Sequence, residues 1–391
     1  MAPEWNKGWL NRNIFAISAA TFLMSFGEEL WKRFIPKFLE ALGAPITAVG
    51  FYGSIKDLID GLYQYPGGWI SDRLGRRAAL LIFVSLAICG YLLYVLAPTW
   101  HYVIIGVFFV MAWASMANPT LFAVIGDALP RGNRAAGFTV QSLLRRVPIM
   151  IAANLGAALI AAYGLIQGVR MSLGLTIGAA LVTGAVVSTI RLPSVHKSES
   201  DGIPARQMLG PVLRRLLSSD ILIRFCEGLS DVLTVIYATS VIGVSVAQYG
   251  VLVAIQMATS IAAYIPAVRV ADRVGRKPFV IATFVFFALF PVAVVLSNGF
   301  GSLVVAFIIG GLREIGEPSR KAMIVDLALP AYRGRTVGLY YLIRSVSIAP
   351  AAYIGGLLWT LGARTPFLAA GIVGLAGTIV FAMTVDERYA S

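Results

Sequence analysis

Two stretches of this chain, PGGWISDRLGRR at residues 66–77 and PAVRVADRVGRK at residues 266–277, repeat one pattern at a shift of 200 residues. Each copy contains the string Asp-Arg-x-Gly-Arg and lies at the end of a long, mostly apolar run. A glycine between two arginines permits a tight turn, so each copy is expected to end one helix and begin the next. The pattern indicates a chain built from two similar halves.

Further positions extend this internal repeat along the chain. Pro119 has a counterpart in Pro318, and Glu28 has one in Glu227. The string IGDALP at 125–130 is also echoed by IVDLALP at 324–330. The two halves therefore match well beyond one short motif.

The composition is too apolar for a soluble protein. Of 391 residues, 58% are hydrophobic and only 13% are charged, whereas soluble domains carry about a quarter charged residues. A spanning helix needs about 20 mostly apolar residues, and twelve runs suited to that role lie at about 13–42, 46–71, 77–97, 102–128, 135–162, 169–191, 219–243, 248–270, 277–297, 302–328, 336–361 and 366–385. The sequence predicts an all-α membrane protein with a six-helix bundle at 1–191, a polar linker at 192–218 and a second six-helix bundle at 219–391.

Basic residues gather on one side of the predicted spans. The segments between spans hold Arg73, Arg76, Arg77, Arg131, Arg134, Arg191, Lys197, Arg206, Arg214, Arg215, Arg273, Arg276, Lys277, Arg333 and Arg335 on that side, against little beyond Arg170 and Arg364 on the other. The positive-inside rule makes the basic side cytoplasmic. We expect a multi-pass protein of the cell's inner membrane with both termini in the cytoplasm, and the net charge of +13 needs no nucleic acid to explain it.

Together, the repeat and the loop motif make the chain resemble the major facilitator superfamily over essentially its whole length. Within that superfamily it most resembles the proton-coupled drug and metabolite antiporters. The first loop fits the superfamily's cytoplasmic signature, and the second departs from it where Val268 replaces a glycine. The resemblance implies two bundles related by a pseudo-two-fold axis along the membrane normal, with a substrate site near the midplane between them. It also implies that the loop residues form a cytoplasmic gate, namely Gly68, Asp72, Arg73, Gly75, Arg76 and Asp127, with Asp272, Arg273, Gly275, Arg276 and Asp326 in the second half. The drug-antiporter branch itself fits less well, because the fifth span carries RRVPIM at 145–150 without that branch's glycines.

Many ionisable residues lie inside the predicted spans. The acids, our candidates for proton coupling, are Glu28, Glu29, Asp57, Asp60, Glu227, Asp231, Glu314 and Glu317, and the bases, our candidates for the substrate cavity, are Lys56, Arg145, Arg146, Arg224, Arg313 and Arg344. A lone charge at the bilayer centre costs about 2.5–3.5 kcal/mol on insertion scales. Because these charges fall on spans 1, 2, 5, 7, 10 and 11, we expect them to face one another or a water-filled cavity.

Two of the acids stand out as a proton site. Glu227 and Asp231 lie four residues apart on one helix face, and like charges so close favour the protonated form of one of them. Arg224 lies one turn away. Arg344 has no acid within four residues, so it needs a partner on another helix or on a substrate. The alternative is that the charges form structural ion pairs that fix the helix register.

The favoured hypothesis is a proton-coupled carrier that exports a polar, charged or amphiphilic small molecule, acting as a monomer among membrane lipids. Its alternative is an uptake symporter for an organic anion or zwitterion, anchored by Arg145, Arg146 or Arg344. An enzyme is disfavoured because only two histidines and two cysteines occur and no catalytic motif is found. No cofactor or metal is expected, and a sensor that retains the fold without transporting is a remaining possibility.

Overall fold

The structure is a computed structural model that describes residues 7–117, 149, 151–189, 209–328 and 333–385. It falls into two compact units, one of residues 1–43 and 62–199 and the other of residues 44–61 and 200–391. Residues 44–61, which the sequence places in the first bundle, group with the second unit.

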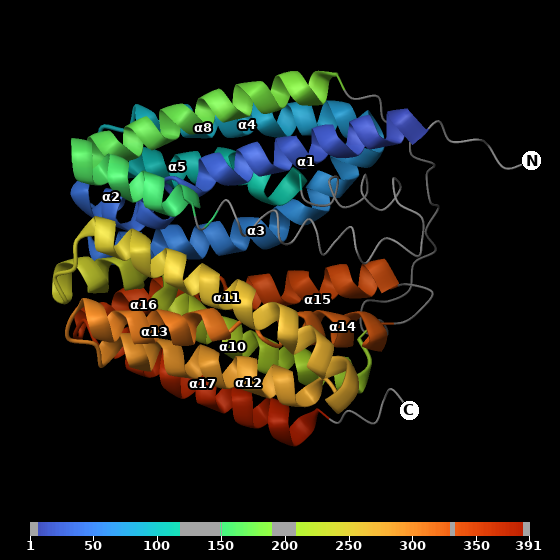
Figure 1. Ribbon diagram of the computed structural model, residues 1–391, viewed down its shortest axis with the longest axis vertical. Coiled ribbons are helices and arrows are strands. Elements are labelled where there is room, and N and C mark those ends of the chain that lie inside the picture. Colours follow the sequence, from blue (N-terminus) through green and yellow to red (C-terminus); the bar gives the residue numbers. More distant parts are fainter. Residues whose placement is uncertain (1–6, 118–148, 150, 190–208, 329–332, 386–391) are drawn as a thin grey trace, which may run out of the picture. The chain divides into compact units, whose positions relative to one another are not determined.

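All regular structure in the described ranges is helical (Figure 1). The first unit contains α1 (Lys7–Glu29), the short turn η1 (Lys32–Phe34), α2 (Ile35–Ala41), α4 (Arg76–Val95), α5 (Trp100–Met111), η2 (Ala112–Met116), a helix at Ile151–Tyr163 and α8 (Leu165–Ser188). The second contains α10 (Pro211–Ile236), η4 (Tyr237–Val241), α11 (Val246–Val274), α12 (Lys277–Val295), α13 (Phe300–Leu312), α14 (Glu317–Leu327), α15 (Arg333–Ile348), α16 (Ala351–Thr360) and α17 (Thr365–Thr384). Helix α3 (Ile46–Leu74) contributes residues to both units.

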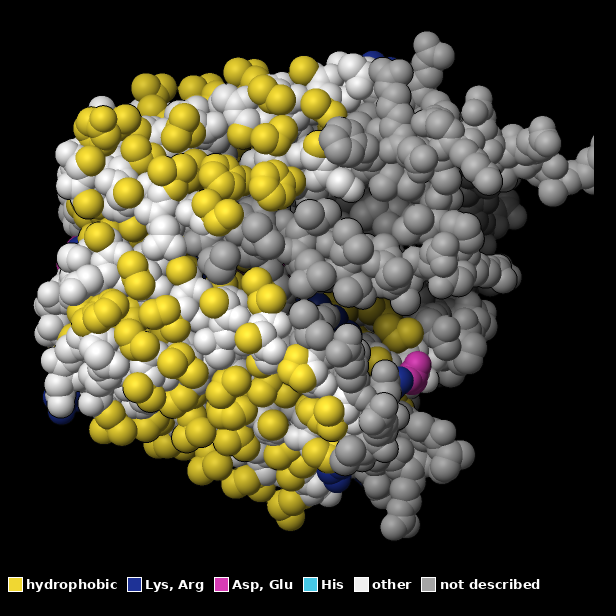
Figure 2. All heavy atoms as spheres, viewed as in Figure 1, with side chains coloured by type: hydrophobic (Ala, Val, Ile, Leu, Met, Phe, Trp, Pro, Cys, Tyr) yellow, Lys and Arg dark blue, Asp and Glu magenta, His cyan; other side chains and the backbone are white. Residues whose placement is uncertain are grey.

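Within the described ranges, six helical segments are long and apolar enough to cross a bilayer. They are Arg76–Val95, Leu165–Ser188, Val246–Ala263, Lys277–Val295, Thr336–Thr360 and Thr365–Thr384, and shorter apolar helices lie at Trp100–Met116 and Ile151–Tyr163. Hydrophobic side chains spread over the described surface of these helices (Figure 2), and large ones such as Leu96, Leu296 and Met383 are exposed. Such a surface suits a lipid solvent, in which helices satisfy their own backbone groups.

The repeated loop forms the predicted tight turns. Gly75 has φ +84° and Gly275 has φ +102°, values that a residue with a Cβ adopts only with strain. Gly75 separates α3 from α4, and Gly275 lies between the last residue of α11 and the start of α12. The glycines therefore let two helices turn back at equivalent points of the two halves.

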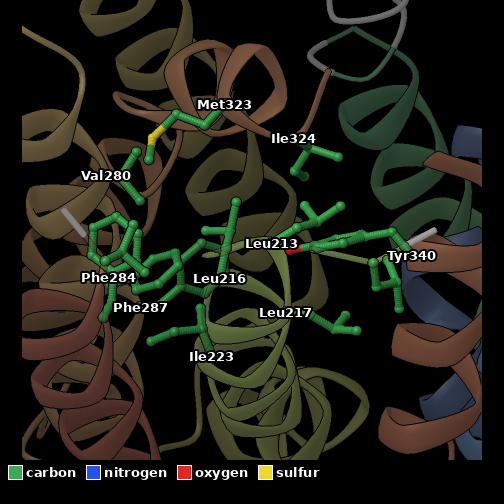
Figure 3. Packing of buried hydrophobic residues seen from close by; sticks show 13 residues of the cluster. Leu213, Leu216, Leu217, Ile223, Val280, Phe284, Phe287, Met323, Ile324 and Tyr340 are labelled. Atoms are coloured by element: carbon green, nitrogen blue, oxygen red, sulfur yellow. The ribbon is translucent and has the colours of Figure 1, made fainter. Parts of the chain in front are cut away.

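Helix α10 organises the second unit. It packs against α12, α15, α16 and α17, and Leu213, Leu216 and Leu217 recur on one face at helical spacing. The buried cluster around them is Leu209, Leu213, Leu216, Leu217, Ile223, Val280, Phe284, Phe287, Met323, Ile324, Tyr340, Phe381 and Val385 (Figure 3). This packing fixes the polar positions of α10 relative to α14 and α15.

The predicted tenth span is broken in its middle. Helix α13 ends at Leu312 and α14 begins at Glu317, with Pro318 in its first turn, where a proline loses no intrahelical hydrogen bond. The Gly316 N–H donates to Thr283 Oγ1 on α12 at 2.6 Å. A side chain on Gly316 would collide with the backbone of Phe279. The break is thus anchored on α12, and it turns several polar side chains inward.

Candidate functional site

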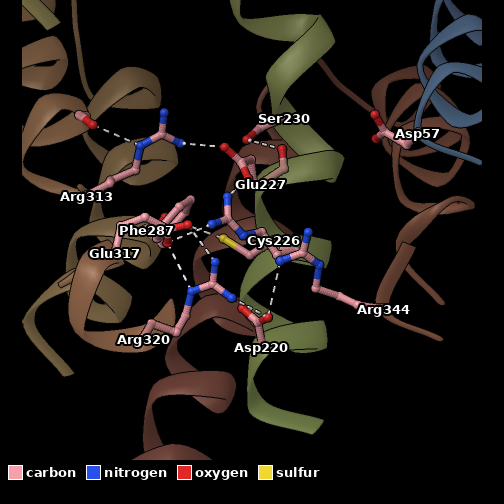
Figure 4. Close-up of polar contacts among 12 residues, drawn as sticks. Asp57, Asp220, Cys226, Glu227, Ser230, Phe287, Arg313, Glu317, Arg320 and Arg344 are labelled. Carbon is pink, nitrogen blue, oxygen red and sulfur yellow. Dashed lines mark hydrogen bonds and ion pairs between the residues drawn. The ribbon is translucent and has the colours of Figure 1, made fainter. Parts of the chain in front are cut away.

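In the described part of the second unit, seven charged side chains that are buried or partly buried form one connected group, which we call the ionic cluster (Figure 4). Helix α10 supplies Asp220, Arg224 and Glu227, the end of α13 supplies Arg313, α14 supplies Glu317 and Arg320, and α15 supplies Arg344. The α10 members follow the spacing i, i+4, i+7, which puts them on one helix face. The cluster therefore joins four helices through charge pairs.

The innermost pair is Asp220 with Arg320, whose side chains are 0% and 1% exposed. Arg320 Nη1 donates to Asp220 Oδ2 at 2.6 Å, while its Nε and Nη2 donate to the two carboxylate oxygens of Glu317 at 3.0 and 2.6 Å. The Tyr340 hydroxyl also donates to Asp220 Oδ2, at 3.0 Å. Arg320 thus has a carboxylate partner for each of its guanidinium nitrogens, as a buried arginine requires. The Asp220–Arg320 ion pair is therefore the most buried contact of the cluster, and we regard it as the cluster's structural centre.

Arg224 bridges the two glutamates of the cluster. Its Nη1 donates to Glu227 Oε2 at 2.9 Å and its Nη2 to Glu317 Oε2 at 3.1 Å. Its guanidinium lies over the Phe287 ring, 4.9 Å from the centroid, an arrangement that favours a cation. Arg224 thus couples α10 to α14.

Arg313 reaches the cluster because α13 ends there. Its Nη1 lies 3.5 Å from Glu227 Oε1, and its Nε donates to the Gly310 carbonyl at 3.0 Å. The guanidinium lies between two rings, 4.9 Å from the Phe287 centroid and 4.6 Å from that of Phe290. Glu227 is consequently held by two arginines from different helices.

Arg344 is the least constrained of the four arginines. Its Nη1 lies 3.4 Å from Asp220 Oδ2, and its guanidinium lies 4.5 Å from the Tyr341 ring centroid. Its Nε is buried without a hydrogen-bond partner, as is Asp220 Oδ1. The acid that the sequence left unidentified for Arg344 is therefore Asp220, on another helix.

The cluster carries more positive than negative charge. Among the described residues, its four guanidinium groups face three carboxylates. Lys321 lies outside it, 61% exposed, with Nζ 3.7 Å from Glu317 Oε1. A buried group with an excess positive charge is suited to receive an anion.

The other predicted intramembrane residues are distributed more widely. In the first unit, Glu28 accepts a hydrogen bond from the Tyr91 hydroxyl at 2.8 Å, and Glu29 pairs with Lys32 at 3.5 Å and Arg33 at 3.4 Å. In the second unit, Lys56 pairs with Asp57 at 3.4 Å, Asp60 and Glu314 are half-buried, and Asp231 is exposed. Arg145 and Arg146 lie outside the described residues.

The gate motif is partly described. Arg276 Nη1 forms an ion pair with Asp326 in the second half. In the first half Arg73 lies 4.3 Å from the Trp69 ring centroid, Arg76 is buried and Gly68 is half-buried. Asp127, together with the side chains of Asp72, Asp272 and Arg273, lies outside what the structure describes.

Three members of the site were not among the predicted residues. Asp220 is the second residue of the predicted seventh span, next to the polar linker, Arg320 lies in the predicted tenth span but was not singled out, and Tyr340 is one of 15 tyrosines. The i, i+4, i+7 spacing of Asp220, Arg224 and Glu227 was the available signal. No group of three or more His, Cys, Asp or Glu side chains in the described ranges could hold a metal ion.

Comparison with known proteins gives a single family. The family model described as Major Facilitator Superfamily matches residues 17–228 and 216–391. An uncharacterized MFS-type transporter of Methanocaldococcus jannaschii is 19% identical over 389 residues, which are 95% of this chain and 94% of that protein.

Solved structures share the fold. A POT family transporter in complex with a thioalcohol conjugated peptide has a TM-score of 0.79 at 14% identity, with 95% of both chains covered. A point mutant of the nucleoside transporter NupG also has a TM-score of 0.79, at 12% identity, with 95% of this chain and 100% of that chain covered. At these identities the likeness concerns the fold, and it confirms the predicted all-α membrane architecture.

Proposed function

Since this chain belongs to the Major Facilitator Superfamily, it is a multi-pass membrane transporter and not an enzyme, and we propose that it is a proton-coupled carrier that works by alternating access and exports a polar, charged or amphiphilic small molecule. The ionic cluster is the observation that supports this proposal most directly. Buried charges are costly even when paired, and within a membrane they mark ion and substrate pathways.

Glu227 is the leading candidate for the proton carrier. Its side chain is 27% exposed, against 11% for Glu317 and 0% for Asp220, so it is the cluster's most accessible carboxylate. Two arginines, Arg224 and Arg313, hold its charged form. Protonation would cancel both attractions at once and release α10 from the end of α13, which would link proton binding to a helix movement.

The other acids inside the predicted spans are weaker candidates for proton coupling. Glu28 and Glu29 occupy the matching region of the first unit, and Asp231 lies one turn from Glu227. The Arg276–Asp326 ion pair supports a cytoplasmic gate in the second half, with the first-half loop in the same role. We place the protein in the inner membrane, as a monomer with both termini cytoplasmic and bundle boundaries near residues 191 and 219.

Uptake of an organic anion or zwitterion together with protons is the second candidate. The excess of arginine over carboxylate in the cluster favours it, because an anionic substrate would neutralise that charge. Both candidates couple proton movement to the movement of a small solute, and they differ in whether proton and solute move in opposite directions or together.

Reconstitution into liposomes that contain a pH-sensitive dye tests both candidates. Panels of anions, zwitterions and lipophilic cations are added outside without a pH gradient. Solute entry in exchange for protons makes the lumen more alkaline, whereas entry together with protons makes it more acidic, so the sign identifies the mode.

Two variants sharpen this assay. Glu227→Gln should abolish the pH change and leave counterflow of the solute in place, since it removes only the titrating group. Arg215→Gln removes an exposed charge of the same helix that contacts the Thr384 carbonyl and no member of the cluster, and it should behave as the parent protein. Proton movement that persists in the Glu227→Gln variant would refute Glu227 as the carrier.

A further inference from the structure

Arg344 differs from the other arginines of the ionic cluster in how few groups hold it. Arg320 uses all three of its guanidinium nitrogens in hydrogen bonds to carboxylates. Within the described part of the chain, Arg344 makes one polar contact, at 3.4 Å, and one ring contact. Its side chain is 17% exposed and its Nε has no hydrogen-bond partner. One edge of the guanidinium is therefore unused.

The partner of Arg344 does not depend on it. Asp220 Oδ2 already accepts from Arg320 Nη1 at 2.6 Å and from the Tyr340 hydroxyl at 3.0 Å, and both contacts are shorter than that to Arg344. If Arg344 moved away, Asp220 would remain charged and paired. The reverse also holds, because the Tyr341 ring would still support the guanidinium.

We propose that Arg344 anchors a substrate carboxylate and exchanges its contact with Asp220 for that carboxylate when the substrate binds. The proposal rests on the transport function proposed above, and it names the substrate class as organic monocarboxylates. The planar guanidinium presents two parallel N–H groups that match the two oxygens of a carboxylate. A lysine at the same position would supply the charge without this fork.

The charge balance selects a monoanion. Among its described side chains the cluster has one guanidinium more than it has carboxylates, and the nearby Lys321 is 61% exposed, so solvent screens its charge. One negative charge therefore neutralises the buried group, and a dianion would leave the opposite excess. Tyr341 lies against the guanidinium plane and leaves its edge for a ligand. A carboxylate fits this edge better than inorganic phosphate, which is a dianion for much of the neutral range.

Ligand binding to the purified full-length protein in detergent tests the proposal without any gradient. Thermal unfolding is measured with acetate, lactate, benzoate and phenylpropionate, each beside its carboxamide, and with inorganic phosphate. At least one carboxylate should raise the unfolding temperature where its carboxamide and phosphate do not. Arg344→Lys and Arg344→Gln should weaken that binding roughly 10- to 100-fold, the value of a charge-assisted hydrogen-bond pair.

Two controls separate binding from folding and from transport. Arg215→Gln, an exposed change on α10 outside the cluster, should bind the carboxylate as the parent protein does. The unliganded unfolding temperature of Arg344→Lys shows whether the fold is intact. The proposal is overturned if no carboxylate exceeds its amide, or if a folded Arg344→Lys variant binds as tightly as the parent. Carboxylate binding without proton movement in liposomes would instead count against the proposed function alone.

Discussion

Replacing Asp220 should destabilise the second unit more than replacing any exposed acid. In the Asp220→Ala variant, Arg320 Nη1 and the Tyr340 hydroxyl lose their acceptor in a site with no exposure. Removing one partner of a buried ion pair costs about 3–5 kcal/mol. Because Arg320 keeps two bonds to Glu317, we expect the lower end, about 3 kcal/mol, which multiplies the unfolding equilibrium constant by roughly 150. Asp220→Asn retains an acceptor oxygen and should lose about half as much.

Denaturant titration of the full-length protein in detergent micelles, followed by helical circular dichroism, measures these free energies. The matched control is Asp326→Asn, which breaks an exposed ion pair with Arg276 and should cost less than about 1 kcal/mol. A double-mutant cycle with Arg320→Gln should give a coupling energy of about 1.5 kcal/mol or more. If Asp220→Ala costs no more than Asp326→Asn, or if its effect adds to that of Arg320→Gln, the ion pair is not the structural centre of the cluster.

Three further predictions use the same preparations. Gly316→Ala places a methyl group against the Phe279 backbone and should lower the free energy of unfolding by about 1–3 kcal/mol, and an unchanged denaturation midpoint would contradict the anchored break. Tyr91→Phe removes a hydrogen bond to buried Glu28 and should cost about 1.5–3 kcal/mol in the same titration, so a loss below about 0.5 kcal/mol would show that other groups hold this carboxylate. Arg276→Gln should cost less than about 1 kcal/mol yet change the rate of solute counterflow in liposomes, and an unaltered rate would argue against a gate at this ion pair.

The architecture was predictable from the sequence because its signals are local and repeated. An Asp-Arg-x-Gly-Arg string needs only its own glycine to turn, and both Gly75 and Gly275 have positive φ as expected. The long apolar runs indicate helices surrounded by lipid, because a helix hydrogen-bonds its own backbone polar groups and needs about 20 mostly apolar residues to cross a bilayer. Neither signal depends on which helices become neighbours.

The cluster's pairing was less predictable because it depends on those neighbours. Helical spacing places Glu227 and Asp231 on one face of α10, and that much is local. In the structure Glu227 forms an ion pair with Arg313, 86 positions away. The two side chains meet because the tenth span is broken near Gly316 and Pro318, which places Arg313 beside α10. The sequence displays the glycine and the proline but not the side to which the broken helix turns.

Asp220 was missed for a related reason. Its neighbours Ser218 and Ser219 continue the polar linker, so hydropathy places it at a membrane face. The structure extends α10 from Pro211 and buries Asp220 completely. Only its helical phase relative to Arg224 carries the information that it faces the same partners. A residue at a span's edge can thus belong to the interior when its helix begins earlier than its apolar run.

The two halves also differ in a packing exchange that bears on the cluster. Gly90 in α4 faces Val110 in α5, whereas at a shift of 200 residues Phe290 in α12 faces Gly310 in α13. The small and large partners have changed sides, and in both pairs the glycine lets the two helices approach closely. In the second half the exchange has a chemical consequence, because the Phe290 ring lies 4.6 Å from the guanidinium of Arg313, where the equivalent Gly90 offers no side chain. The Phe290 ring therefore supports the Arg313 guanidinium beside Glu227 in the second half, and the residue at the equivalent position of the first half, Gly90, has no side chain that could do the same.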